Sequence, residues 1–138
     1  MSPLSRFSGF LTLLAVAGTS LPAHALAEGA CPIVSSGQWH AWIDRFPGKG
    51  INRLIVTGVV DFPSPGYRWR MVKAGGIRGR PPVQELRLEI DPPEGIVAQV
   101  VTPVEIRGEA KTAFSNLRVL VSCGGRRLAY FDQVVITD

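Results

Sequence analysis

Apolar and polar residues alternate along several short segments of this chain, and glycine or proline separates one segment from the next. The alternation is clearest over residues 83–90, where Leu86, Leu88 and Ile90 share one face and charged residues occupy the positions between them. A period of two residues is typical of a half-buried β-strand, because successive side chains point to opposite faces of the sheet. The pattern therefore predicts a protein built from strands.

Seven or eight segments fit this description, and none has the capped amphipathic pattern of a helix. The expected strands cover residues 38–44, 54–60, 67–73, 83–90, 96–101, 104–107, 117–123 and 126–136, with loops at 74–82 and 109–115. Residues 96–101 and 104–107 are either two strands or one strand broken near Pro103. Short strands separated by turn signals are typical of an antiparallel β-sandwich, with a small β-barrel as the alternative. The strand count is immunoglobulin-like, although the disulfide of immunoglobulin domains has no counterpart in the cysteine positions.

Two turn glycines, Gly124 and Gly125, separate the last two expected strands. Such a pair predicts a tight hairpin, because both central residues of the favoured turn need a positive φ that glycine adopts freely. The odd-numbered residues from Leu117 to Cys123 then share one face, so Cys123 is expected to point into the core.

The first 25 residues have the layout of a secretory signal peptide. A short segment with one cation precedes an apolar run, and the small-residue pattern Ala23-His24-Ala25 follows. We expect cleavage after Ala25, which leaves residues 26–138 as a single β-sandwich domain. An uncleaved anchor is the alternative, but polar residues and a proline interrupt the run before the ~20 apolar residues that a span needs.

The two cysteines of the chain, Cys31 and Cys123, predict a disulfide, because an even cysteine count in an exported chain is typical of an oxidised pair. A lipidated Cys31 is disfavoured by the charged Glu28 shortly before it. Zinc is disfavoured as well, because His40 would be the one histidine left after cleavage. In a chain-entropy estimate a loop of this length stabilises the fold by ~4 to 5 kcal/mol.

Three short motifs carry a family resemblance: Pro63-Ser64-Pro65-Gly66-Tyr67, Arg80-Pro81-Pro82-Val83-Gln84 and Val121-Ser122-Cys123-Gly124-Gly125. Through them the chain resembles a set of small exported bacterial proteins of uncharacterised function. The motifs consist of turn residues and a cysteine, so the resemblance implies no activity.

The sequence contains no strong catalytic motif. His40 could act as a general base only beside a nucleophile, and no Gly-x-Ser-x-Gly turn supplies one. Glu85 and Glu89 share a strand face, but Arg87 lies between them, which favours a solvated ladder of charges over a pair of catalytic carboxylates. We therefore predict no catalytic residues, no metal site and no cofactor.

One charge feature remains. Five cations and no acid occur between Asp61 and Glu85: Arg68, Arg70, Lys73, Arg78 and Arg80. Arginine suits carboxylates and phosphates, so this basic strip is a candidate partner-binding surface, although cations on an edge strand also prevent aggregation. We add His40 and Trp42 to it, because Trp42 must face outward beside His40 if Trp39 faces inward.

These patterns predict a non-enzymatic binding domain in the periplasm or outside the cell, with a protein or an anionic envelope component as its partner. The alternative is an inhibitor of a secreted hydrolase such as a protease or a lysozyme. The formal charge of +4 falls to +3 once the signal peptide and its Arg6 are removed, which is too low to favour nucleic acid. No stable membrane span is expected after cleavage.

Overall fold

Seven β-strands make up most of the computed structural model, which describes residues 18, 30–46, 48, 50–76 and 78–137. The strands are β1 (Ser35–Arg45), β2 (Asn52–Phe62), β3 (Arg68–Lys73), β4 (Val83–Asp91), β5 (Thr102–Thr112), β6 (Asn116–Cys123) and β7 (Arg126–Thr137). No helix occurs among the described residues. The predicted signal peptide and its cleavage site lie outside them, Gly18 excepted.

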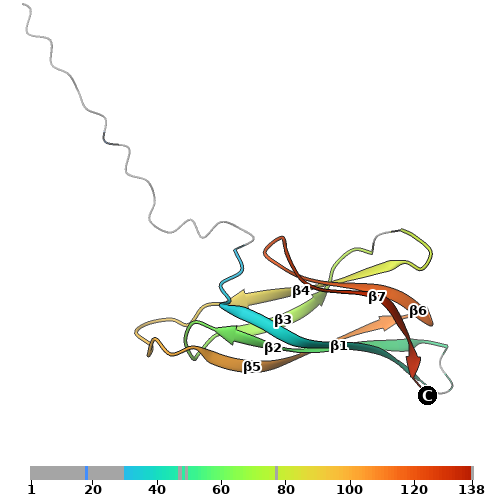
Figure 1. Cartoon of the computed structure of the whole chain (residues 1–138), viewed down its shortest axis with the longest axis horizontal. Helices are drawn as coiled ribbons and strands as arrows, with labels where there is room; N and C mark the ends of the chain where they lie inside the picture. Colours follow the sequence, from blue (N-terminus) through green and yellow to red (C-terminus); the bar gives the residue numbers. More distant parts are fainter. Residues whose placement is uncertain (1–17, 19–29, 47, 49, 77, 138) are drawn as a thin grey trace, which may run out of the picture.

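Hydrogen bonds join the strands into one sheet of order β3-β4-β6-β7-β1-β2-β5 (Figure 1). Strand β7 links its two halves, because β7 pairs antiparallel with β6 and its Ile136 and Thr137 pair parallel with β1. The outermost strands β3 and β5 also approach each other, and the Lys73 Nζ donates a hydrogen bond to the carbonyl oxygen of Lys111 across the seam (3.1 Å).

This arrangement is a nearly closed, barrel-like sheet. The all-β class predicted from the sequence is thereby confirmed. The single sheet is closer to the barrel alternative than to the two separate sheets of the expected sandwich, because β7 pairs on both of its edges.

The interior is filled by the inward faces of all seven strands. Fully buried apolar side chains include Ile43, Leu54, Val56, Val60, Phe62, Leu86, Leu88, Ile106, Leu117, Val119 and Val121. The partly buried Trp39 packs against this core, as the alternation in β1 predicts. Its ring lies against Gly58, where an added Cβ would come within 2.6 Å of the Trp39 Cδ2. The glycine in β2 thus marks a close approach of ring and backbone.

The disulfide between Cys31 and Cys123 is present, with the two Cα atoms 5.4 Å apart. Cys123 is buried at the end of β6, and the hairpin that follows has the expected turn, with φ of 56° at Gly124 and 75° at Gly125. The bond attaches the segment before β1 to the core, where Ile33 is also buried. The predictions of the hairpin, its inward cysteine and the bridge are confirmed.

Two segments differ from the strands expected from the sequence. Residues 96–101, predicted as a strand, form a loop, because no strand pairs with them. Residues 109–112, predicted as loop, continue β5, because they pair with residues 52–55 of β2. Pro103 lies within β5 without breaking it, since β5 pairs through hydrogen bonds with β2 alone and an edge strand tolerates a missing N–H.

The contact between Gly58 and Trp39 predicts a stability difference between two glycines. Replacing Gly58 by alanine should lower the free energy of unfolding by about 1–3 kcal/mol, because the methyl group would displace the Trp39 ring from a packed core. Gly37 on β1 is the matched control, since a Cβ there meets nothing within 4 Å and its φ is not positive. Urea unfolding of Gly58→Ala and Gly37→Ala measures the difference, and equal stabilities would contradict the packing.

Candidate functional site

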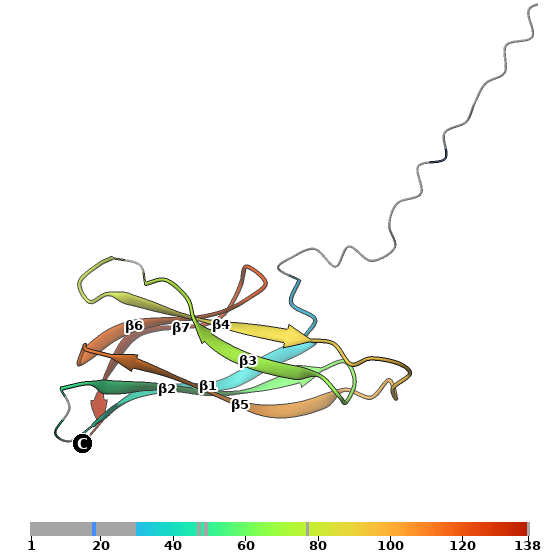
Figure 2. The ribbon, with the colours of Figure 1, turned by 180° about the vertical axis from the view of Figure 1, so that it is seen from behind.

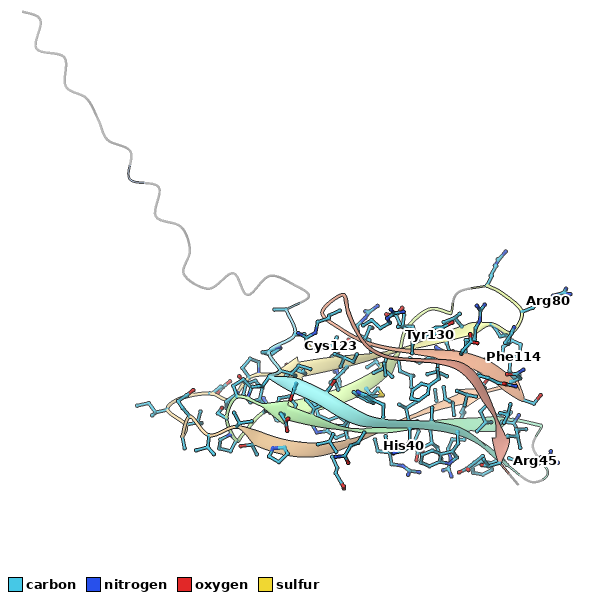
Figure 3. The ribbon with its side chains drawn as sticks, in the orientation of Figure 1. His40, Arg45, Arg80, Phe114, Cys123 and Tyr130 are labelled. Carbon is cyan, nitrogen blue, oxygen red and sulfur yellow. A yellow bond between two sulfur atoms is a disulfide. The ribbon has the colours of Figure 1, made fainter. Side chains whose placement is uncertain are left out.

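Three connections meet at one end of the barrel: those between β1 and β2, between β3 and β4, and between β5 and β6. Arg45, Arg80 and Phe114 mark this end in Figure 3. The connection between β5 and β6 is bonded to the start of β2, because the side-chain amide of Asn52 donates a hydrogen bond to the carbonyl oxygen of Phe114 (3.1 Å). We call this region the basic end and define it by residues 44–46, 48, 50–53, 74–76, 78–82, 109–116 and 118.

Three large apolar side chains of the basic end are exposed to solvent: Phe46 (44%), Ile51 (44%) and Phe114 (52%). Two hollows lie at this end. One is lined by Phe46 and Ile51, and the other, of about 470 Å³, has walls formed by Pro81, Pro82 and Phe114. Exposed aromatic rings beside a hollow are typical of interaction surfaces.

Cations outnumber acids at this end. The cations are Arg45, Arg53, Arg78, Arg80, Lys111 and Arg118, and the acids are Asp44 and Glu109. Both carboxylates contact Arg53, at 3.3 Å from Asp44 and 3.6 Å from Glu109. Arg78 and Arg80 are exposed, and neither has a hydrogen bond or an ion pair with any residue that the structure describes. Their guanidinium groups are therefore available to an anionic group from outside.

The loop that carries Arg78 and Arg80 is held in place by bonds on both sides. At its start, the buried Gln84 donates a hydrogen bond to the carbonyl oxygen of Ala74 (3.0 Å). Near its end, Arg118 donates from Nε to the carbonyl oxygen of Pro81 (3.0 Å) and from its backbone N–H to that of Pro82 (2.9 Å). A loop fixed in this way loses less conformational entropy when it binds a partner.

The other three cations of the predicted strip lie elsewhere, at exposed positions of β3. Arg70 pairs with Glu89 of β4, with Nε 2.6 Å from the carboxylate, and Lys73 bonds across the seam to β5. Arg68 lies opposite Asp91 in the strand register. The structure thus divides the strip: two cations belong to the basic end, and three follow β3, where acids of β4 face two of them.

His40 and Trp42 face outward from β1, as the sequence predicts, but two strands, β2 and β5, separate them from β3 across the seam. Trp42 is half-buried beside Ile55, which is 1% exposed although it faces outward, and the Arg107 guanidinium lies 5.7 Å from the Trp42 ring centroid. Trp42 is therefore partly covered by its neighbours on β2 and β5. His40 is exposed and lines a separate shallow hollow, so neither residue joins the basic end.

Phe46, Ile51 and Phe114 were not among the site residues predicted from the sequence. Each is a large apolar residue within or beside a predicted turn, and this is the signal that would have indicated them. Arg118 was also missed, because its position in a predicted core strand hides its bond to the loop.

No group of three or more histidine, cysteine, aspartate or glutamate residues in the described part of the chain is placed to hold a metal ion. None of the described residues belongs to a helix long and apolar enough to span a membrane. Comparison of the chain with protein-family models, with curated proteins and with solved structures gave no match.

The bond from Arg118 to Pro81 predicts how the loop responds to a protease. In Arg118→Leu the loop should open about five times more often, because a lost hydrogen bond of ~1 kcal/mol changes a local equilibrium by that factor. Trypsin should then cleave the Arg78–Gly79 bond about five times faster. Arg126→Leu, at an exposed position in the β6–β7 hairpin, is the control and should match the wild type. Equal cleavage rates in both variants would contradict this role of Arg118.

Proposed function

We propose that this chain is a non-enzymatic, exported binding domain whose basic end contacts an anionic partner, either a protein or an anionic component of the cell envelope. The observation that carries the proposal is the position of Arg78 and Arg80, two exposed guanidinium groups without a partner among the described residues, beside the exposed ring of Phe114. Aromatic residues and arginine are both enriched at protein interfaces.

The disulfide supports an oxidising compartment, because such bonds form and persist outside the cytoplasm. A signal peptide over residues 1–25 and a location in the periplasm or outside the cell are parts of the same proposal. The charge of the basic end favours carboxylates or phosphates on the partner, and the hollow beside Phe114 favours an apolar group near that anion.

Charge reversal at the two arginines tests the proposal. Purified wild-type protein used as bait in an envelope extract should recover a partner, and Arg78→Glu/Arg80→Glu should recover about tenfold less of it, because two attractive charges become repulsive. Arg126→Glu/Arg127→Glu makes the same charge change at exposed positions of the hairpin and should recover as much as the wild type. Equal losses in both variants, or unchanged recovery in the first, would refute binding through the basic end.

The second candidate function is inhibition of a secreted hydrolase. The loop between β4 and β5 favours it, because this loop projects from the barrel and Ile96 is fully exposed on it. Local hydrogen bonds from Val100 N–H to the Ala98 carbonyl oxygen (3.0 Å) and from Thr102 Oγ1 to the Val100 carbonyl oxygen (2.8 Å) hold its shape. A protruding, preformed loop suits insertion into an enzyme cleft.

An enzyme panel distinguishes this candidate. If the protein is an inhibitor, an equimolar amount should abolish the activity of at least one secreted protease or lysozyme, and Ile96→Asp should restore that activity. Full activity of every enzyme in the panel at equimolar protein would remove this candidate and leave the binding domain.

A further inference from the structure

The connection between β4 and β5 exposes an unusual amount of apolar side chain. Ile96 (105%), Val100 (61%) and Val101 (54%) all face solvent, and no charged residue occurs between Glu94 and Glu105. We call residues 96–101 the apolar loop. Contiguous apolar side chains exposed in this way mark an interaction site rather than ordinary surface.

The apolar loop lies at the end of the barrel opposite the basic end. Figure 1 shows the β4–β5 connection at one end and the β3–β4 connection and C-terminus at the other, and the view from behind agrees (Figure 2). A single molecule therefore cannot bring its own apolar loop to its own basic end. Contact between the two requires a second molecule.

The charges at the two ends are complementary. Around the apolar loop lie the exposed acids Asp91, Glu94 and Glu105, with Arg68 as the cation facing Asp91 in the register. At the basic end cations exceed acids, and Arg78 and Arg80 have no partner among the described residues. Opposite charges on two surfaces steer their encounter and fix their relative orientation.

We propose that the apolar loop of one molecule docks into the basic end of a second copy, in the hollow between Pro81, Pro82 and Phe114. Ile96 enters this hollow, and Glu94 contacts the guanidinium group of Arg78 or Arg80. This inference rests on the proposed function, because it names the anionic partner of the same surface.

Association of this kind joins different surfaces of the two copies. Each added molecule leaves one apolar loop and one basic end unoccupied, so the contact repeats and produces chains rather than closed dimers. The assembly is consequently expected to grow with protein concentration and to weaken as salt screens the charges.

Two variants test the proposal, each with one altered surface. Ile96→Asp/Val100→Asp alters exposed positions of the loop, and Arg78→Glu/Arg80→Glu alters exposed positions of the basic end, so the folded core is untouched. In sedimentation velocity the disulfide-bonded domain, residues 26–138, should form species larger than dimers as its concentration rises. Each variant alone should associate at least ~10-fold more weakly.

The decisive sample is an equimolar mixture of the two variants. The intact basic end of the loop variant and the intact loop of the other variant can still meet once, so the mixture should form dimers and nothing larger. Arg126→Glu/Arg127→Glu should assemble like the wild type, because its altered charges lie on the hairpin.

Several results would overturn the proposal. The wild-type protein could stay monomeric at all concentrations. Either the loop variant or the basic-end variant could assemble like the wild type. The equimolar mixture of the two variants could stay monomeric. Flotation with phosphatidylcholine or phosphatidylglycerol vesicles provides a further arm, and loop-dependent flotation of a monomeric protein would assign the apolar loop to lipid instead.

The proposed function is tested separately. A monomeric protein whose recovery of an envelope component still depends on Arg78 and Arg80 would refute self-association alone. A protein that neither self-associates nor recovers an envelope component through Arg78 and Arg80 would refute the proposed function as well.

Discussion

The whole structure depends on the double pairing of β7. Most of this strand pairs with β6, and its last residues pair with β1 through the register of Ile136 and Thr137. Its end is also bonded to the connection that carries Phe114, because the Ile136 N–H donates to the Ser115 carbonyl oxygen (3.2 Å). Without β7 the strands would form two separate halves, and the three connections of the basic end would have no fixed relation to one another.

The candidate site combines cations that have no partner among the described residues with an exposed aromatic ring, that of Phe114. Arg53 and Arg70 each contact a carboxylate on a neighbouring strand. Exposed ion pairs of this kind contribute little to stability, but they occupy the guanidinium groups. Arg78 and Arg80 lie on a loop beyond the strand ends, where no acid of the described chain reaches them. Arg118 bonds to the carbonyl oxygen of Pro81, next to Arg80, and restraint of this kind lowers the entropic cost of binding a partner.

The features that depend on residues close together in the sequence were predicted correctly. The alternation around Leu86, the two turn glycines before β7 and the inward cysteine of β6 are all found in the structure, because each follows from backbone geometry alone. Pairing between distant segments was not predictable. Residues 96–101 are rich in β-branched side chains but lack a neighbouring strand, while residues 109–112 are a strand because β2 pairs with them. The candidate site was only partly predictable, because it too depends on contacts between distant segments. Arg78 and Arg80 were predicted as site residues together with Arg68, which is near them in the sequence, whereas in the barrel they lie beside Phe114.

The central claim is that the basic end, and not the outer face of β3 or of β1, recognises an anionic, apolar-containing ligand. Backbone amide NMR tests it most directly, with a synthetic peptide of alternating glutamate and leucine titrated into the domain. The account predicts that the shifted amide signals concentrate on Asn52, Gly79 and Phe114. Shifts centred on Arg68 and Arg70, or on His40 and Trp42, would contradict it.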